Sequence, residues 1–158
     1  MGVSGSGKST IADHLAARLG WRYEDGDRFH PASNVAKMSA GHPLTDEDRW
    51  PWLQAIADEI DRLAAAGERA VIACSALKRA YRDILVHGRD DVRIIFLDGT
   101  QDLIAARRGH FMPPGLLASQ FKTLERPGTN ERPITVSIDA PVGAIVDNVI
   151  SQLNLVPQ

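Results

Sequence analysis

Eight consecutive residues near the start of the chain have the types and the spacing that bind phosphate groups. From Gly2 to Ser9 they read Gly-Val-Ser-Gly-Ser-Gly-Lys-Ser, which fits the phosphate-loop pattern G-x-x-x-x-G-K-S/T at every fixed position. The glycines let backbone N–H groups turn toward phosphate oxygens, Lys8 bridges β- and γ-phosphates, and Ser9 binds Mg²⁺. A Gly/Ser-rich turn matching by chance is the alternative, but the amphipathic helix that phosphate binding requires follows it. The candidate nucleotide-binding residues are Gly2, Ser4, Gly5, Ser6, Gly7, Lys8, Ser9 and Thr10.

Two carboxylates follow the next predicted strand. Asp25 and Asp27 flank Gly26, so in an extended segment both point to one side, and the glycine permits a close approach by another group. Phosphoryl transfer needs a group that accepts the proton of the acceptor hydroxyl and a ligand for Mg²⁺. We assign Asp27 to the acceptor and Asp25 to the metal. A surface Asp-Gly turn is the alternative reading.

The strand after these carboxylates ends in Cys74-Ser75-Ala76-Leu77-Lys78, without the acid that often holds the Mg²⁺ shell in phosphate-loop proteins. This absence argues against a GTPase switch or a motor ATPase and favours transfer to a small acceptor. Lys78 and Arg82 lie four residues apart and form a candidate site for an anionic group. A solvated basic helix face is the alternative. Cys74 has the character of a small buried residue.

Arginines mark a third candidate region, near residues 105–115. Arg107 and Arg108 precede Gly109 and two prolines, a composition that predicts a mobile lid. Arginines that swing over the phosphates stabilise the charge that spreads over the equatorial oxygens during transfer, and a guanidinium also stacks on adenine. The alternative is a helix end where arginine complements the dipole.

Alternating strands and helices must position these residues. Continuous apolar runs indicate buried parallel strands, helical spacing marks the segments between them, and a capping box at Thr45 opens a long helix that Gly67 stops. We predict an α/β fold, a parallel sheet between two layers of helices, with the site at the carboxyl ends of the strands. Strands are expected at 21–24, 70–74, 92–97 and 134–138, and helices at 11–19, 46–66, 76–86, 100–108, 115–124 and 142–153.

Length and composition favour one domain over residues 1–158. A formal charge of −2 gives no bulk field for nucleic acid or an anionic membrane, and no apolar run is long enough to span a bilayer. One cysteine and no signal peptide indicate a cytoplasmic, disulfide-free protein. A phosphate loop normally follows a buried strand, whereas only Met1 precedes Gly2, so we expect a first strand upstream of Met1.

Several motifs together resemble the thermoresistant gluconokinase family, and the match spans nearly the whole chain. They are the phosphate loop, Asp25-Gly-Asp27 with His30-Pro31, Lys37-Met38, Pro43-Leu44-Thr45-Asp46, Arg49, Pro51-Trp52, Cys74 to Lys78, Tyr81-Arg82-Asp83, Gly109-His-Phe111 and Ser119-Gln-Phe121 through Glu125. Relative to the family pattern, the segment before Gly109 is shorter, and a second arginine beyond Arg107 is missing.

The resemblance implies a fold like that of nucleoside monophosphate kinases, a homodimer, and ATP-dependent phosphorylation of D-gluconate at its 6-hydroxyl, giving 6-phosphogluconate and ADP. Gluconate is a polyol with a carboxylate, so it needs hydroxyl acceptors and a cation. The implied substrate-binding residues are Asp27, His30, Lys37, Arg49, Lys78, Arg82 and His110. Two alternatives stay open: a kinase for another small acceptor such as shikimate, and a nucleotide-binding module without catalysis.

Overall fold

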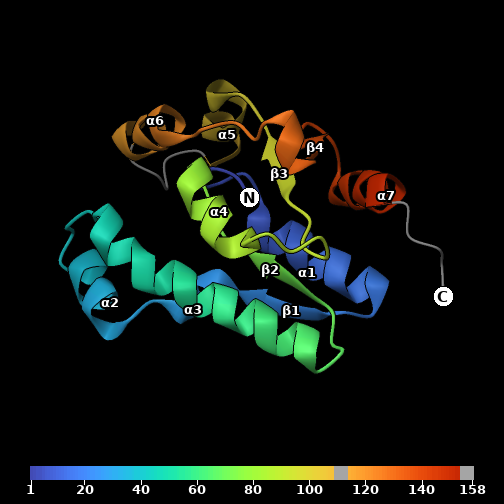
Figure 1. Cartoon of the computed structure of the whole chain (residues 1–158). Coiled ribbons are helices and arrows are strands. Elements are labelled where there is room, and N and C mark those ends of the chain that lie inside the picture. Colours follow the sequence, from blue (N-terminus) through green and yellow to red (C-terminus); the bar gives the residue numbers. More distant parts are fainter. Residues whose placement is uncertain (109–113, 154–158) are drawn as a thin grey trace.

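Four short parallel strands form the centre of the protein (Figure 1). In this computed structural model, which describes residues 1–108 and 114–153, β1 (Arg22–Asp25) pairs with β2 (Ala70–Ala73). β3 (Ile95–Asp98) pairs with β4 (Ile134–Ser137) in the same parallel sense. The α/β class with a parallel sheet, predicted from the sequence, is therefore confirmed.

The backbone of Met1 and Gly2 joins the two strand pairs. The N–H of Leu97 in β3 donates to the Met1 carbonyl over 3.0 Å, and the Gly2 N–H donates to the Ser75 carbonyl, just after β2, over 3.2 Å. The phosphate loop therefore starts between the carboxyl ends of β2 and β3. The expectation of a strand upstream of Met1 stays a prediction.

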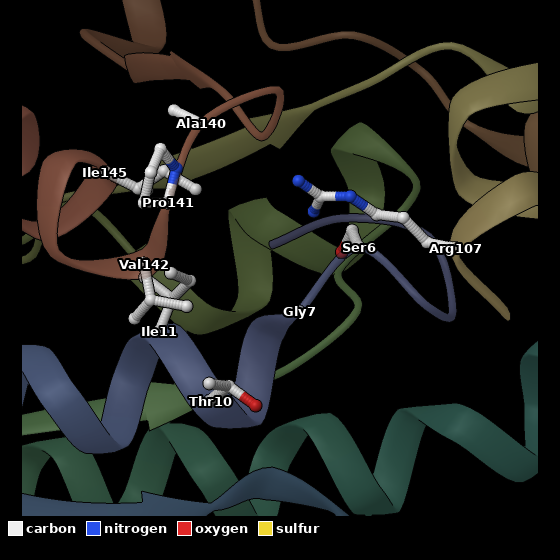
Figure 2. A pocket seen from close by; sticks show the side chains of 9 residues that line it. All are labelled: Ser6, Gly7, Thr10, Ile11, Arg107, Ala140, Pro141, Val142 and Ile145. Atoms are coloured by element: carbon white, nitrogen blue, oxygen red, sulfur yellow. The ribbon is translucent and has the colours of Figure 1, made fainter.

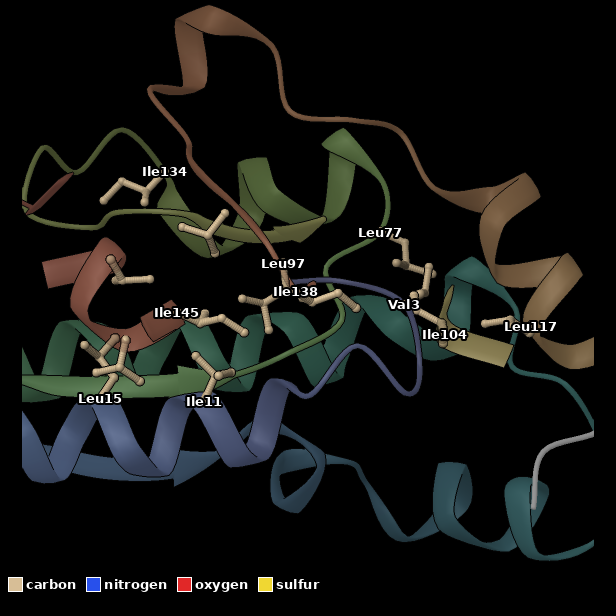
Figure 3. Close-up of a cluster of buried hydrophobic side chains, with 13 residues drawn as sticks. Val3, Ile11, Leu15, Leu77, Leu97, Ile104, Leu117, Ile134, Ile138 and Ile145 are labelled. Carbon is tan, nitrogen blue, oxygen red and sulfur yellow. The ribbon is translucent and has the colours of Figure 1, made fainter. Parts of the chain in front are cut away.

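Helices flank the strands on both sides, and two separate apolar clusters fill the space between the layers. Figure 3 shows α1 in front of β2 and the long α3 behind it. One cluster joins α1, β3, β4 and α7, and the other joins α3 to α4 and the residues after β2. The helices are α1 (Lys8–Leu19), α2 (Ala32–Ser39), α3 (Asp46–Ala65), α4 (Arg79–Val86), α5 (Gln101–Arg108), α6 (Pro114–Thr123) and α7 (Val142–Leu153), with short 3₁₀ helices at Gly26–Phe29 and Thr129–Glu131.

Local sequence signals set most helix boundaries. α1 ends at Gly20, whose φ of 69° suits glycine, and its N–H caps the helix on the Ala16 and Ala17 carbonyls. At the start of α3, the Thr45 hydroxyl accepts the Asp48 N–H over 3.2 Å, while the Asp48 carboxylate accepts the Thr45 N–H over 2.9 Å. The predicted capping box is thus confirmed, and Pro51 lies within the first two turns of the helix.

Three predicted elements need correction. α4 begins at Arg79 rather than Ala76, because Ala76 has a positive φ of 47° that no helix accommodates. β3 begins at Ile95 rather than Val92. β4 is covered on one face only: Ile134 and Val136 are buried while Thr135 and Ser137 are exposed, which fits a strand at the edge of the sheet.

Within the described ranges, none of the helices combines the length and the apolar character needed to cross a bilayer.

Candidate active site

The phosphate loop leads straight into α1, which begins at Lys8. Gly7 precedes the helix with a φ of 96°, a left-handed conformation that glycine adopts without strain. The Lys8 ammonium donates to the Val3 carbonyl over 3.1 Å, so its side chain folds back over the loop. Val3 itself is buried in the apolar cluster and anchors the loop to the core. The loop therefore directs backbone N–H groups and one cation to the N-terminus of a helix, an arrangement that favours anions.

Asp25 and Asp27 lie on the same side of the strand ends, as predicted, although only Asp25 is in the strand. The Asp25 carboxylate accepts the Asp27 N–H over 3.0 Å and caps the 3₁₀ helix that holds Asp27. Gly26, between them, is buried against β2. A Cβ there would lie 2.5 Å from the Ala73 carbonyl oxygen, so the close approach requires glycine.

Four residues predicted to take part in phosphoryl transfer line one cavity of about 180 Å³. Lys8 and Ser9 line it from the start of α1, and Asp25 and Asp27 line it from the end of β1. Gln120 of α6, which the sequence analysis did not single out, lines it too. The remaining lining residues are Ser4, Ala73, Cys74 and Ser75.

The same cavity suits Mg²⁺ that arrives with a nucleotide. It offers the Ser9 hydroxyl and the carboxylates of Asp25 and Asp27, all oxygen ligands. Among the described residues, no group of three or more His, Cys, Asp and Glu side chains is placed to hold a metal ion. Mg²⁺ at phosphates uses one or two carboxylates and takes its other ligands from phosphate and water, so this donor set fits.

A second cavity, of about 370 Å³, is lined by Ser6 and Gly7 of the phosphate loop. Figure 2 shows the Arg107 guanidinium reaching into it from α5, above the turn at Ser6 and Gly7. Arg107 also donates to the Ile138 carbonyl, which fixes the guanidinium at the cavity wall. Apolar side chains from α1 and from the start of α7 form the opposite wall: Ile11, Ala140, Pro141, Val142 and Ile145.

His30 is held by contacts on its face and its edge. Its ring stacks on Trp52 with centroids 4.2 Å apart, and Trp52 donates to the Gly26 carbonyl over 2.8 Å. The side-chain amide of Asn34, which is 2% exposed, lies 3.2 Å from His30 Nδ1 and donates to the Asp48 carbonyl over 2.8 Å. Burial lowers the pKa of His30, and Arg49 lowers it further, against an opposing effect of Asp27. A neutral His30 with Nδ1 accepting from Asn34 carries its proton on Nε2.

The other basic candidates on this side carry carboxylate partners. Lys37 pairs with Asp48 at 2.7 Å, and this hydrogen bond is the main cause that lowers the pKa of Asp48 to about 2. Lys78 and Arg49 both face Asp46, at 3.3 and 3.6 Å. The Tyr81 hydroxyl donates to the same Asp46 carboxylate and is the main cause that lowers its pKa.

Arg82 does not join this group, which corrects its predicted role. It is 1% exposed, and its guanidinium binds Glu131 through two hydrogen bonds of 2.7 and 3.3 Å. It also donates to the carbonyls of Ala76 and Leu77 over 2.9 and 3.1 Å. Burial opposes ionisation of Glu131, but Arg82 and the Gly128 N–H keep its pKa below the ordinary value. Four of the five guanidinium N–H groups are thus used inside the protein, and Arg82 is a structural residue.

Two predicted residues cannot be placed. His110 lies outside the described residues, together with part of the predicted lid at 105–115. Arg108 ends α5, and its side chain also lies outside them.

Sequence reasoning missed Gln120 and Asn34. Asn34 lies four residues after His30, so the spacing of one helical turn offered a signal. Gln120 stands in the Ser119-Gln-Phe121 motif but had no local feature that indicated a polar site.

Comparison with known proteins identifies the family. A family model described as Shikimate kinase matches residues 4–120. A thermosensitive gluconokinase of Escherichia coli K12 is 50% identical over 143 residues, which cover 88% of this chain and 76% of the relative. A thermoresistant gluconokinase of the same strain is 43% identical over 155 residues, 95% of this chain and 89% of the relative. This chain belongs to the gluconokinase family.

A solved gluconokinase supports the same family at the level of structure. The crystal structure of the enzyme from Sinorhizobium meliloti 1021 matches this fold with a TM-score of 0.87 at 43% identity. The match covers 97% of this chain and 88% of that chain. The resemblance to gluconokinases drawn from the motifs is therefore confirmed, and the chain is a phosphate-loop kinase.

Proposed function

We propose that the protein transfers the γ-phosphoryl group of ATP to the 6-hydroxyl of D-gluconate, giving 6-phospho-D-gluconate and ADP. The observation that carries this proposal is the cavity in which Lys8 and Ser9 meet Asp25 and Asp27. The choice of gluconate as the acceptor rests on relatives named gluconokinase, which are 43% and 50% identical to this chain. Two cavities that the phosphate loop lines support this proposal, the larger as the donor site and the smaller as the acceptor site.

ATP fits with its base in the larger cavity and its phosphates along the loop. The apolar wall around Pro141 and Val142 suits adenine, and Arg107 is placed to stack on it or to reach the phosphates. The N-terminus of α1 and the Lys8 ammonium favour the negative charge of the β- and γ-phosphates. The γ-phosphoryl group then points into the smaller cavity, toward Asp27.

Transfer requires the acceptor hydroxyl to attack the γ-phosphorus in line with the bond to ADP. As the new P–O bond forms, the bond from the γ-phosphorus to the bridging oxygen of ADP breaks, and the proton of the hydroxyl passes to Asp27. Lys8 stabilises the charge that gathers on the phosphate oxygens. Mg²⁺, bound by Ser9 and Asp25 with the nucleotide, would neutralise part of that charge.

Lys78 and Arg49 are the best-placed cations for the gluconate carboxylate. Both face Asp46, so two positive charges share one carboxylate and leave an excess of one positive charge. Lys37 is less suitable, because Asp48 neutralises it at 2.7 Å. We assign His30, with its Nε2–H, to an oxygen of the polyol chain.

An acceptor panel tests the function directly. ADP release from ATP and Mg²⁺ is measured with D-gluconate, with shikimate and without acceptor, for the wild type and for Lys8→Ala. We expect turnover with gluconate alone, and its loss in Lys8→Ala because the phosphate clamp is removed. Turnover with shikimate would favour the rival kinase, and ATP binding without turnover would favour the non-catalytic module.

Two further features are part of the proposal. The family resemblance supports a homodimer, which light scattering on the purified protein would test. A cytoplasmic location is supported by the cysteine content, since the sequence has one cysteine and Cys74 is a free, buried thiol.

A further inference from the structure

Gln120 is held in place by the packing of α6. It lies one turn after Leu117, which is buried in the same apolar cluster as Val3 of the phosphate loop (Figure 3). After Gln120, the N–H of Glu125 donates to the Leu77 carbonyl over 2.8 Å and fixes the end of the helix. The core therefore sets the distance between this face of α6 and the phosphate loop.

The side-chain amide of Gln120 lies between the phosphate loop and the 180 Å³ cavity that Lys8, Ser9, Asp25 and Asp27 line, called the transfer cavity from here on. Its Oε1 accepts the backbone N–H of Ser4, 116 residues away in the sequence. The same side chain lines the cavity with Lys8 and Asp27. Its Nε2 makes no hydrogen bond to any described residue, so the oxygen is anchored while the two N–H donors remain available for a ligand.

We propose that Gln120 is a catalytic residue whose Nε2–H group donates to an oxygen of the transferring phosphoryl group. The proposal rests on the proposed function and adds a residue to it. The cavity is where the γ-phosphoryl group and the acceptor hydroxyl meet, so a fixed neutral donor there faces oxygens that gain charge during transfer. Gln120 itself neither gains nor loses a proton, and the bonds made and broken are those described above.

A purely structural role makes a different prediction. If Gln120 only anchored Ser4, its oxygen alone would matter, and Gln120→Glu would keep that oxygen in an isosteric side chain. If the donor matters, Gln120→Glu is the more damaging change, because it replaces N–H with a negative oxygen facing phosphate. Gln120→Ala removes both the anchor and the donor without adding charge. Which of the two variants has the lower kcat therefore distinguishes a catalytic donor from a structural anchor.

The test is steady-state kinetics of both variants, with MgATP dissociation constants measured by calorimetry. We expect kcat to fall about 10²–10³-fold in Gln120→Ala, since loss of one donor to a developing oxyanion costs about that much, and to fall further in Gln120→Glu, which also places a negative charge beside the phosphate. The dissociation constant for MgATP should rise less than about threefold in Gln120→Ala. Gln152 of α7 gives matched controls: it is exposed, it binds Asn148, and its Glu and Ala variants should keep wild-type kinetics.

Near-wild-type kcat in Gln120→Glu, with or without a defect in Gln120→Ala, would overturn the inference. So would a loss in Gln120→Ala that lies entirely in MgATP affinity. Failure of the proposed function is seen separately, in the acceptor panel on the wild type. If another acceptor is the one phosphorylated, the same comparison of variants is made with that acceptor.

Discussion

At the scale of single residues, the different roles proposed for Asp25 and Asp27 predict different kinetic defects. Asp27→Asn should lower kcat with gluconate about 10²–10⁴-fold, because the amide cannot take the hydroxyl proton, while the ATP dissociation constant changes less than twofold. Asp25→Asn should instead raise the Mg²⁺ concentration that gives half-maximal rate. Steady-state kinetics with titrated Mg²⁺ separates the two, with exposed Asp58→Asn as the control. Normal gluconate turnover in Asp27→Asn would exclude it as the base.

Sequence analysis could single out the residues that belong to short motifs. The phosphate loop, Asp25-Gly26-Asp27 and the Thr45 capping box each lie within a few positions, so spacing alone identified them. Gln120 and Arg82 were missed or misassigned because their partners lie 116 and 49 residues away. Such contacts depend on how the helices pack, which residue spacing does not report.

At the scale of elements, the loop before α4 depends on the buried pair between Arg82 and Glu131. Arg82→Met should destabilise the protein by about 3–5 kcal/mol, because Glu131 and the carbonyls of Ala76 and Leu77 lose their partner in a buried position. Urea unfolding followed by circular dichroism measures the change. Arg79→Met is a half-exposed comparison: Arg79 pairs with Asp83, donates to Asn130 and approaches Glu131 only to 4.0 Å, so its loss should cost less than about 1 kcal/mol.

Glu131→Gln in the Arg82→Met background should recover part of the stability, since the buried charge is then removed as well. KM for gluconate in the folded fraction should stay within about threefold of wild type. If Arg82→Met raised KM for gluconate tenfold without changing the stability, Arg82 would be a substrate-binding residue and the structural assignment would be wrong.

At the scale of the whole molecule, the layers that build the site also carry a carboxyl pair that makes stability depend on pH. Glu24 in β1 is 8% exposed and lies beside Glu59 of α3, between the sheet and the helix layer. Burial, together with the Glu59 carboxyl, raises the pKa of Glu24, while Arg62 is the main cause that lowers the pKa of Glu59. The native state therefore holds a proton on Glu24 above the pH at which the unfolded chain has lost it.

Because the folded-state pKa of Glu24 is raised, its contribution to stability is complete below its ordinary pKa of 4.5 and is lost as pH rises through the raised value. Glu24→Gln mimics the protonated form. It should unfold at about 2–4 °C higher temperature than wild type at pH 8, roughly the effect of 1 kcal/mol in a domain of this size, and at nearly the same temperature at pH 4.5. Calorimetry at both pH values measures this, with exposed Glu68→Gln as the control. A lower unfolding temperature for Glu24→Gln at pH 8 would mean that the ion pair of Glu24 with Arg22, at 3.1 Å, outweighs both burial and the Glu59 charge.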